Sequence, residues 1–246
     1  MNYDVIVSLT TWKRRIEDPR FLRVLYRLLK EQLTVYKYKV VLVLSEDEFI
    51  GRKIPIAVKA FENIDNFEIL WTKKNTKALK KLDPTMFKYD KTPIITTDDD
   101  ILVTTDMVNT MVRLHKANPK YILGQKCICT KSNLIIVSRL RLYPPNSISY
   151  LPEHLYDKYC FGVMDDEWNA IRAMNKGVKS KKINYNLIEN LEYCGKSSAL
   201  NLVYRTFDII KSINDFRKDY PEYFLTEEEF LKSSLSNYLS KVGGDE

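Results

Sequence analysis

Short apolar runs alternate with amphipathic stretches along the first half of the chain. Runs of the length of a buried strand lie at 5–9, 39–44, 67–71 and 93–97. Apolar residues with helical spacing lie at 19–33 and 105–117. Such alternation predicts an α/β fold whose mainly parallel sheet is covered by helices on both faces. A ligand site is then expected at the carboxyl ends of the strands.

The pattern changes after residue 120. A strand is expected over 134–142, where polar residues alternate with apolar ones and fit either an antiparallel or a half-exposed position. A helix is expected over 165–175, ending at Gly177. Two further helical stretches follow at about 197–213 and 226–241. Because no repeat or low-complexity linker interrupts the chain, we expect one structural unit, with a domain over 1–190 and a helical C-terminal extension over 191–246 packed on it.

Composition narrows the class of protein. The 246 residues are 45% hydrophobic and carry a net charge of +7, which indicates a globular protein with an anionic ligand or surface as a partner. Arginines and aromatics do not gather in one block, so nucleic-acid binding is not expected, and a lysine-rich composition alone could explain the charge. The four cysteines lack zinc-site spacing. No leader or membrane-spanning run is evident, so a cytoplasmic protein is predicted.

Three consecutive aspartates, Asp98, Asp99 and Asp100, follow the apolar run that ends at 97. Adjacent carboxylates repel one another and resist burial unless a cation shares them. Their oxygens suit a hard divalent ion such as Mg²⁺ or Mn²⁺, which favours phosphate as a further ligand. The alternative is a solvated acidic turn that caps a helix.

A second acidic cluster, Asp165-Asp166-Glu167, opens the helix predicted at 165–175. Carboxylates at this place can simply cap the helix or interact with its dipole. Paired with the first cluster they allow group transfer, because a leaving group needs charge stabilisation and an incoming hydroxyl needs a base.

Three motifs occur in order: VSLTTWKRRI near the start, TTDDDIL in the middle and MDDEWNAIRAMNKGVK later. Together they resemble the donor-binding loop, the DXD motif and the acceptor-side acidic motif of a GT-A-fold, nucleotide-sugar-dependent glycosyltransferase of bacterial polysaccharide and surface-glycan assembly. The resemblance covers roughly the first 180 residues and leaves the C-terminal part unmatched.

On the donor side, the resemblance implies that Thr10, Thr11 and Arg15 line the base and ribose pocket. An ordinary exposed arginine in the basic trio Lys13-Arg14-Arg15 is the alternative for Arg15. The resemblance also implies a lysine near the donor, and among the lysines at 73, 74, 77, 80 and 81 the position of Lys77 fits this role. A solvated helix face is expected for most of these lysines.

At the aspartates, the resemblance implies that Asp100 ligates Mn²⁺ or Mg²⁺ bridging the diphosphate, and that Asp98 binds the metal, its water shell or the ribose. Asp99 would point away or touch the sugar. Asp166 matches the general base of inverting members, and Asp165 would bind acceptor or donor sugar. The charges of Asp165 and Glu167 on either side of Asp166 would raise the pKa of Asp166.

Three weaker candidates lie in the second half. His154 could contact acceptor or metal, although an isolated loop histidine is usually incidental. The segment 194–198 could cover the diphosphate or simply cap a helix. Aromatic residues around the same loop could form an acceptor platform or pack in the core; they are Tyr143, Tyr150, Tyr156, Tyr159, Phe161 and Trp168.

The sequence therefore predicts a metal-dependent, inverting glycosyltransferase that uses a nucleotide-diphospho-sugar, with UDP expected, and a glycan or other hydroxyl acceptor. Peripheral association with the inner face of the membrane would suit a lipid-linked acceptor. Retention is the mechanistic alternative. A sugar-nucleotidyltransferase or phosphotransferase is the enzymatic rival, although residues 8–15 lack the glycine that its first loop needs. A non-catalytic nucleotide- or glycan-binding domain is the other rival.

Overall fold

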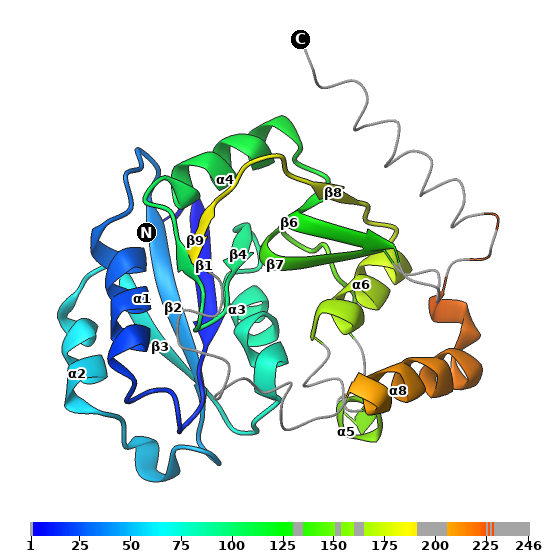
Figure 1. Ribbon diagram of the computed structural model, residues 1–246, viewed down its shortest axis with the longest axis horizontal. Coiled ribbons are helices and arrows are strands. Elements are labelled where there is room, and N and C mark those ends of the chain that lie inside the picture. The colour runs from blue at the N-terminus through cyan, green and yellow to red at the C-terminus, as the bar shows by residue number, and fades with distance from the viewer. Residues whose placement is uncertain are drawn as a thin grey trace.

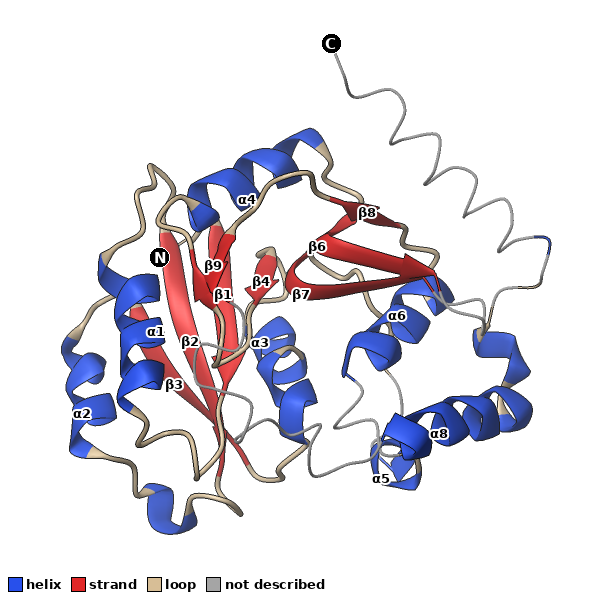
Figure 2. Cartoon of the chain, viewed as in Figure 1, coloured by secondary structure: helices blue, strands red, loops and turns tan. Residues whose placement is uncertain are grey.

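The computed structural model describes residues 2–129, 135–150, 154–159, 165–190 and 206–224, together with residues 226 and 228. Its centre is a seven-stranded sheet with the strand order β3-β2-β1-β4-β7-β6-β8. The first four strands in this order are parallel, β7 is antiparallel to both β4 and β6, and β8 is parallel to β6. Figure 2 shows β6, β7 and β8 extending the sheet away from α1 and α2. The mainly parallel sheet of the predicted α/β fold is confirmed.

The strands are β1 (Val5–Thr10), β2 (Tyr38–Ser45), β3 (Phe67–Thr72), β4 (Ile94–Thr96), β6 (Ile122–Cys129), β7 (Ile135–Tyr143) and β8 (Ser180–Lys182). A separate antiparallel pair joins β5 (Leu102–Val103) to β9 (Ile188–Asn190). Of the two alternatives for the strand expected over 134–142, the antiparallel position is confirmed. The strand β6 was not expected, because Gly124, Gln125 and Lys126 interrupt its apolar pattern.

The helices cover both faces of the sheet (Figure 1). They are α1 (Pro19–Lys30), α2 (Ile56–Lys59), α3 (Asp83–Lys88), α4 (Met107–Ala117), α5 (His154–Lys158), α6 (Asp165–Asn175) and α8 (Thr206–Asp219). Short 3₁₀ helices lie at Ile50–Arg52, Ala60–Asn63, Lys77–Lys81 and Pro221–Tyr223. We call Lys77–Lys81 the lysine turn.

Alternation along β1 explains how the two layers are built. Val5, Val7 and Leu9 enter one core with the apolar faces of α1 and α4. Ile6 enters the other core, which includes residues of α3 and α6. Ser8 points to this second side, where its hydroxyl hydrogen-bonds Thr85 at 2.8 Å. A polar residue in a buried strand therefore ties β1 to α3.

The helix α8 packs on α5 and α6 through aromatic side chains. Phe216 is fully buried, and its ring centroid lies 5.2 Å from that of Trp168 and 5.0 Å from that of Tyr159. The predicted helix at 197–213 differs from the structure, because the described helix continues to Asp219 to bring Phe216 into this contact. Residues 191–205 and most of 226–241 lie outside the described residues, so the boundary at 190/191 stays a prediction.

None of the helices in the described part of the chain combines the length and apolar character needed to cross a lipid bilayer.

Candidate functional site

The carboxyl ends of β1 and β4 bring the first loop and the aspartates together. These strands are parallel neighbours in register, with Ser8 opposite Thr96. The backbone amide of Thr97 continues the pairing with the carbonyl of Ser8 at 3.1 Å. The chain that leaves β4 at Asp98 therefore lies beside the chain that leaves β1 at Thr10.

The middle aspartate is turned into the protein. Asp99 is buried, accepts a hydrogen bond from the Thr11 hydroxyl at 2.6 Å and pairs with the Arg15 guanidinium. Arg15 also contacts Asp100 at 3.2 Å. Burial raises the pKa of Asp99 to about 6 against the opposing effect of Arg15. Asp99 thus anchors the first loop to the aspartate segment.

Arg15 is only 4% exposed, so the interpretation of it as an ordinary exposed arginine is wrong. Its guanidinium contacts Asp99 and Asp100, and the Thr11 hydroxyl bonds to Asp99. The Thr10 hydroxyl donates to the carbonyl of Val43 in β2 at 2.7 Å. The predicted contacts of these three residues with base and ribose stay predictions.

The outer two aspartates are more accessible than the middle one. The side chain of Asp98 is 38% exposed and that of Asp100 is 21% exposed, against 10% for Asp99. Burial raises the pKa of Asp100, and the neighbouring charge of Asp98 adds to this effect. Asp98 and Asp100 are the carboxylates of the triplet that a ligand can reach.

The lysine turn supplies the cation that joins the two acidic clusters. The ammonium of Lys81 lies 2.5 Å from Asp98 Oδ1 and 2.9 Å from Asp165 Oδ2. Its own carbonyl accepts a hydrogen bond from the Ser8 hydroxyl, which fixes the turn against β1. Burial alone would lower the pKa of Lys81, but the charges of Asp165 and Asp98 outweigh it and raise that pKa. The ammonium is therefore charged at neutral pH.

Arg141 holds the second acidic cluster from the other side. This residue of β7 is fully buried, with Nη2 lying 2.8 Å from Asp165 Oδ2 and Nη1 paired with Asp166 Oδ1. The half-exposed alternative for this strand is thus wrong at Arg141. Sequence reasoning missed both this residue and the role of Lys81. Arginines alternating with leucines at 139–142 were the available signal, since a buried arginine needs an acidic partner.

The two aspartates at the start of α6 have opposite electrostatic environments. Burial would raise the pKa of Asp165, but Lys81 and Arg141 together hold it well below its usual range. Burial raises the pKa of Asp166 to about 7, with the charge of Asp165 adding to the effect and Arg141 opposing it. Glu167, expected to contribute to this rise, has a pKa raised by its own burial. Asp165 is the fixed anion of the pair, and Asp166 is the titratable member.

The charges of the site do not balance. Five carboxylates (Asp98, Asp99, Asp100, Asp165 and Asp166) lie among three cations (Arg15, Lys81 and Arg141), which leaves an excess of two negative charges when all are ionised. Within the described ranges, no three metal-ligating side chains converge on one point. Mg²⁺ is typically held by one or two carboxylates together with water and substrate phosphates. Asp98 and Asp100 fit a divalent ion of this kind.

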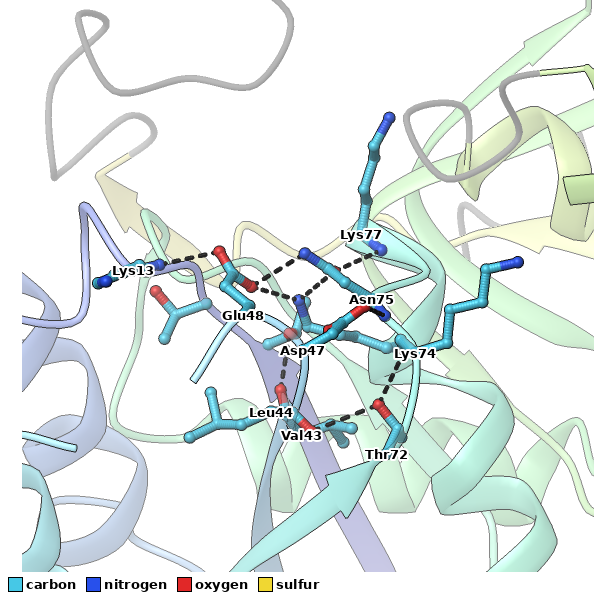
Figure 3. Close-up of polar contacts among 12 residues, drawn as sticks. Lys13, Val43, Leu44, Asp47, Glu48, Thr72, Lys74, Asn75 and Lys77 are labelled. Carbon is cyan, nitrogen blue, oxygen red and sulfur yellow. Dashed lines mark hydrogen bonds and ion pairs between the residues drawn. The ribbon is translucent and has the colours of Figure 1, made fainter. Parts of the chain in front are cut away.

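The donor-side lysines differ in burial. Lys80 and Lys81 are each 2% exposed, so the expectation of a solvated helix face is wrong for both. Lys73 and Lys74 are exposed, and Lys77 is half-buried. Figure 3 shows the side chains of Lys74 and Lys77 pointing away from the polar cluster around Glu48 and Asn75. Lys77 stays the predicted donor-side lysine, and its backbone adopts a positive φ of 53°.

Most of the proposed aromatic platform is core. Tyr143, Tyr156, Tyr159 and Trp168 are buried, as the packing alternative expects, and among the members that the structure describes Tyr150 alone is open to solvent. Tyr156 stacks edge-on with Trp168 at a centroid distance of 5.9 Å. Phe161 and the segment 194–198 lie outside the described residues. His154 is exposed at the start of α5.

Comparisons with known proteins locate this architecture among solved structures. No family model and no curated protein matches the sequence. S. aureus TarS residues 1–349, solved with UDP-GlcNAc, superposes with a TM-score of 0.57 at 13% identity, over 95% of this chain and 73% of that one. The complex of the same TarS fragment with UDP matches over 75% of this chain and 59% of that one, with a TM-score of 0.52 at 14% identity.

The mannosyltransferase PcManGT from Pyrobaculum calidifontis, solved with GDP-Man and Mn²⁺, superposes with a TM-score of 0.56 at 15% identity. That match covers all of this chain and 77% of the mannosyltransferase. At such low identity the likeness concerns the fold. The chain therefore has the GT-A-like fold of nucleotide-sugar glycosyltransferases, as the three ordered motifs in its sequence predict.

Proposed function

We propose that this protein is a metal-dependent glycosyltransferase that moves a sugar from a nucleotide-diphospho-sugar to a hydroxyl acceptor with inversion. The observation that carries the proposal is the continuous chain of ion pairs Asp98–Lys81–Asp165–Arg141–Asp166. It joins Asp98, an accessible carboxylate at a strand end, to Asp166, a carboxylate whose pKa lies near neutrality. Donor activation and proton removal, the two needs of glycosyl transfer, thereby have separate groups within one network of ion pairs.

The donor half is built on Asp98 and Asp100. A bound Mn²⁺ or Mg²⁺ would neutralise charge that develops on the leaving diphosphate. Asp100 is held in place by Arg15, and Asp98 by Lys81. These contacts keep both carboxylates in position before a ligand arrives, so little reorganisation accompanies binding. Thr10, Thr11, Arg15 and Lys77 are proposed to border the nucleotide.

The acceptor half is built on Asp166. Its Oδ1 is engaged by Arg141, and no residue in the described part of the chain donates a hydrogen bond to its Oδ2. Its side chain is 31% exposed and so remains accessible to a substrate. As the acceptor oxygen bonds to the anomeric carbon, its proton passes to Asp166. The bond from that carbon to the diphosphate oxygen breaks, and its electron pair leaves with the nucleotide.

A pKa near 7 suits this role, because a base that titrates close to the working pH is both ionised and sufficiently basic. Asp165 is better suited to holding Lys81 and Arg141 than to accepting a proton, since its pKa is depressed. A contact between Asp165 and the donor or acceptor sugar stays part of the proposal.

Fold neighbours solved with UDP-GlcNAc and with GDP-Man support a nucleotide sugar as donor. UDP is the expected nucleotide. A cytoplasmic location, with peripheral attachment to the inner face of the membrane, remains a prediction. The use of a glycan as acceptor and the absence of nucleic-acid binding are predictions as well.

Thermal unfolding with UDP, GDP, UDP-GlcNAc and GDP-mannose, each with and without Mn²⁺, tests the donor site. We expect at least one nucleotide to raise the Tm by several degrees in a Mn²⁺-dependent way, since a ligand that binds only the folded state stabilises it. Asp100→Ala should abolish the Mn²⁺-dependent part of this shift. The donor assignment fails if no nucleotide stabilises the wild type, or if Asp100→Ala responds as the wild type does.

A further inference from the structure

The loops that follow the first three strands meet at one carboxylate, Glu48 (Figure 3). Oε1 of Glu48 accepts a hydrogen bond from the backbone amide of Lys13 at 3.0 Å. Oε2 accepts from the Asn75 side-chain amide at 3.0 Å and from the Lys80 ammonium at 3.3 Å. Lys13 follows β1, Glu48 follows β2, and Asn75 follows β3. One side chain thus joins three loops that are separate in sequence.

Asn75 extends the same cluster into the lysine turn. Its Oδ1 accepts hydrogen bonds from the Lys80 ammonium at 2.8 Å and from the backbone amide of Lys77 at 2.9 Å. Its own backbone amide donates to Asp47 at 2.8 Å. The bond to Lys77 holds a residue whose positive φ is unfavourable for any side chain with a Cβ. This bond spans only two residues, and the contacts of Asn75 with Asp47 and Glu48 fix the local turn relative to the loop after β2.

A stabilising role is a poor explanation for this arrangement. Lys80 is almost fully buried, and the side chain of Glu48 is largely buried as well. Removing two charges from water costs about as much as their attraction returns, and apolar residues of similar volume often stabilise a fold more. Buried polar groups are better attested as devices that select one geometry. The geometry selected here is that of the three loops at the carboxyl edge of the sheet.

We infer that Glu48, Asn75 and Lys80 are positioning residues for the nucleotide-sugar donor. This inference rests on the proposed function, because two of the loops they join, those after β1 and β3, carry the residues proposed to border the nucleotide. Glu48 holds the start of the first loop at Lys13, and Asn75 sets the backbone of Lys77. Neither Glu48 nor Lys80 needs to touch the donor. Their effect is to keep the three loops at the separation that the donor requires.

Steady-state release of nucleoside diphosphate from UDP-GlcNAc or GDP-mannose, with Mn²⁺ present, provides the test. Glu48→Gln keeps the size of the side chain but removes the charge opposite Lys80. We expect the donor KM to rise about tenfold and kcat to stay within about twofold, because loss of such a hydrogen-bonded pair is worth roughly one decade. Asn75→Ser, which removes the side-chain amide that bonds to Glu48 and Lys80, should likewise raise KM and leave kcat nearly unchanged.

Glu46→Gln is the matched control. Glu46 lies in the same loop, but its side chain pairs with Arg52 at the surface, at 2.5 Å. This variant should keep the wild-type KM, kcat and Tm, because exposed pairs of this kind contribute little. A rise in KM in this variant equal to that in Glu48→Gln would show that any charge change in the loop suffices, and would overturn the inference.

The double variant Glu48→Gln/Lys80→Met separates positioning from stability. Glu48→Gln alone should lower the Tm, because it leaves the buried ammonium without its carboxylate, and the double variant should recover that loss. The donor KM should nevertheless stay high. Recovery of KM together with Tm, or an unchanged KM in Glu48→Gln, would overturn the inference while leaving the proposed function standing. A wild type that neither binds nor turns over a nucleotide sugar would instead refute the proposed function.

Discussion

Lys80 and Lys81 are neighbours in one 3₁₀ turn and equally buried, yet their ammonium groups contact two different polar clusters. Lys80 points to Glu48 and Asn75, which join the loops after β1, β2 and β3. Lys81 points to Asp98 and Asp165, which belong to the two acidic clusters. A 3₁₀ turn rotates successive side chains by about 120°, so adjacent residues reach separate partners. Adjacency in sequence therefore says little about shared function.

The clusters around Lys80 and Lys81 also differ electrostatically. The Lys80 ammonium is buried and is bonded to one carboxylate, that of Glu48, and one neutral amide, that of Asn75. We call this arrangement closed. Around Lys81, the carboxylates outnumber the cations, and Asp98, Asp100 and Asp166 keep exposed surface. A closed cluster suits a fixed scaffold, whereas an unbalanced and partly open one suits the binding of a cation and the transfer of a proton. The following predictions sharpen this contrast.

The largest effect is expected at the proposed base. Asp166→Asn removes proton acceptance while keeping a side chain that Arg141 can still contact, so kcat should fall by about 10³-fold. Binding of nucleoside diphosphate with Mn²⁺, measured by calorimetry, should change less than about twofold, since Asp166 belongs to the acceptor half. Lost nucleotide binding in this variant would move Asp166 to the donor half and contradict its assignment as the base.

The next largest effect is expected at Lys81. Lys81→Met leaves Asp98 and Asp165 without their shared cation, so we expect kcat to fall about 100-fold and the free energy of unfolding to drop by about 3 kcal/mol. Lys81→Arg keeps the charge and should recover most of the stability and part of kcat. Equal kcat values in the two variants, once both are shown to be folded, would mean that the charge at this position has no part in turnover.

A smaller and more specific effect concerns pH. Asp166 must be ionised to accept a proton, and burial raises its pKa to about 7, so kcat/KM should be full above this pH and be lost as the pH falls through it. Asp165→Asn removes a charge that raises this pKa and leaves Arg141 to lower it. The acid limb of the pH–rate profile should therefore move to lower pH in this variant. An acid limb that stays in place or moves upward would contradict the assigned roles.

Much of the scaffold could be predicted from the sequence, because its signal is periodic. Each of the four apolar runs in the first half is a parallel strand, and α6 spans the predicted residues. The aspartate triplet was expected at a strand end and is found there. The strand β6 escaped prediction because polar residues interrupt its pattern, and the lysine turn escaped because its lysines resemble a solvated surface.

The pairings inside the site could not be predicted for a physical reason. Whether a lysine or arginine is buried depends on carboxylates brought close by the tertiary fold, and Lys81 meets Asp165 across 84 residues of sequence. Arg141 likewise depends on the antiparallel placement of β7 beside β4. Glu48 carried no motif at all, since its importance lies in what it joins. Sequence motifs indicated which carboxylates to examine, and the fold determined how they are held.

Comparing Lys80→Met with Lys81→Met in one kinetic experiment tests the division of the site most directly. Release of nucleoside diphosphate would be followed as a function of sugar-nucleotide concentration, with Mn²⁺ saturating and folding checked by thermal unfolding. The account predicts a raised donor KM with nearly normal kcat for Lys80→Met, and a strongly reduced kcat for Lys81→Met. If both substitutions change the same parameter to the same extent, the two lysines do not have separate roles in donor positioning and turnover, and the account is wrong.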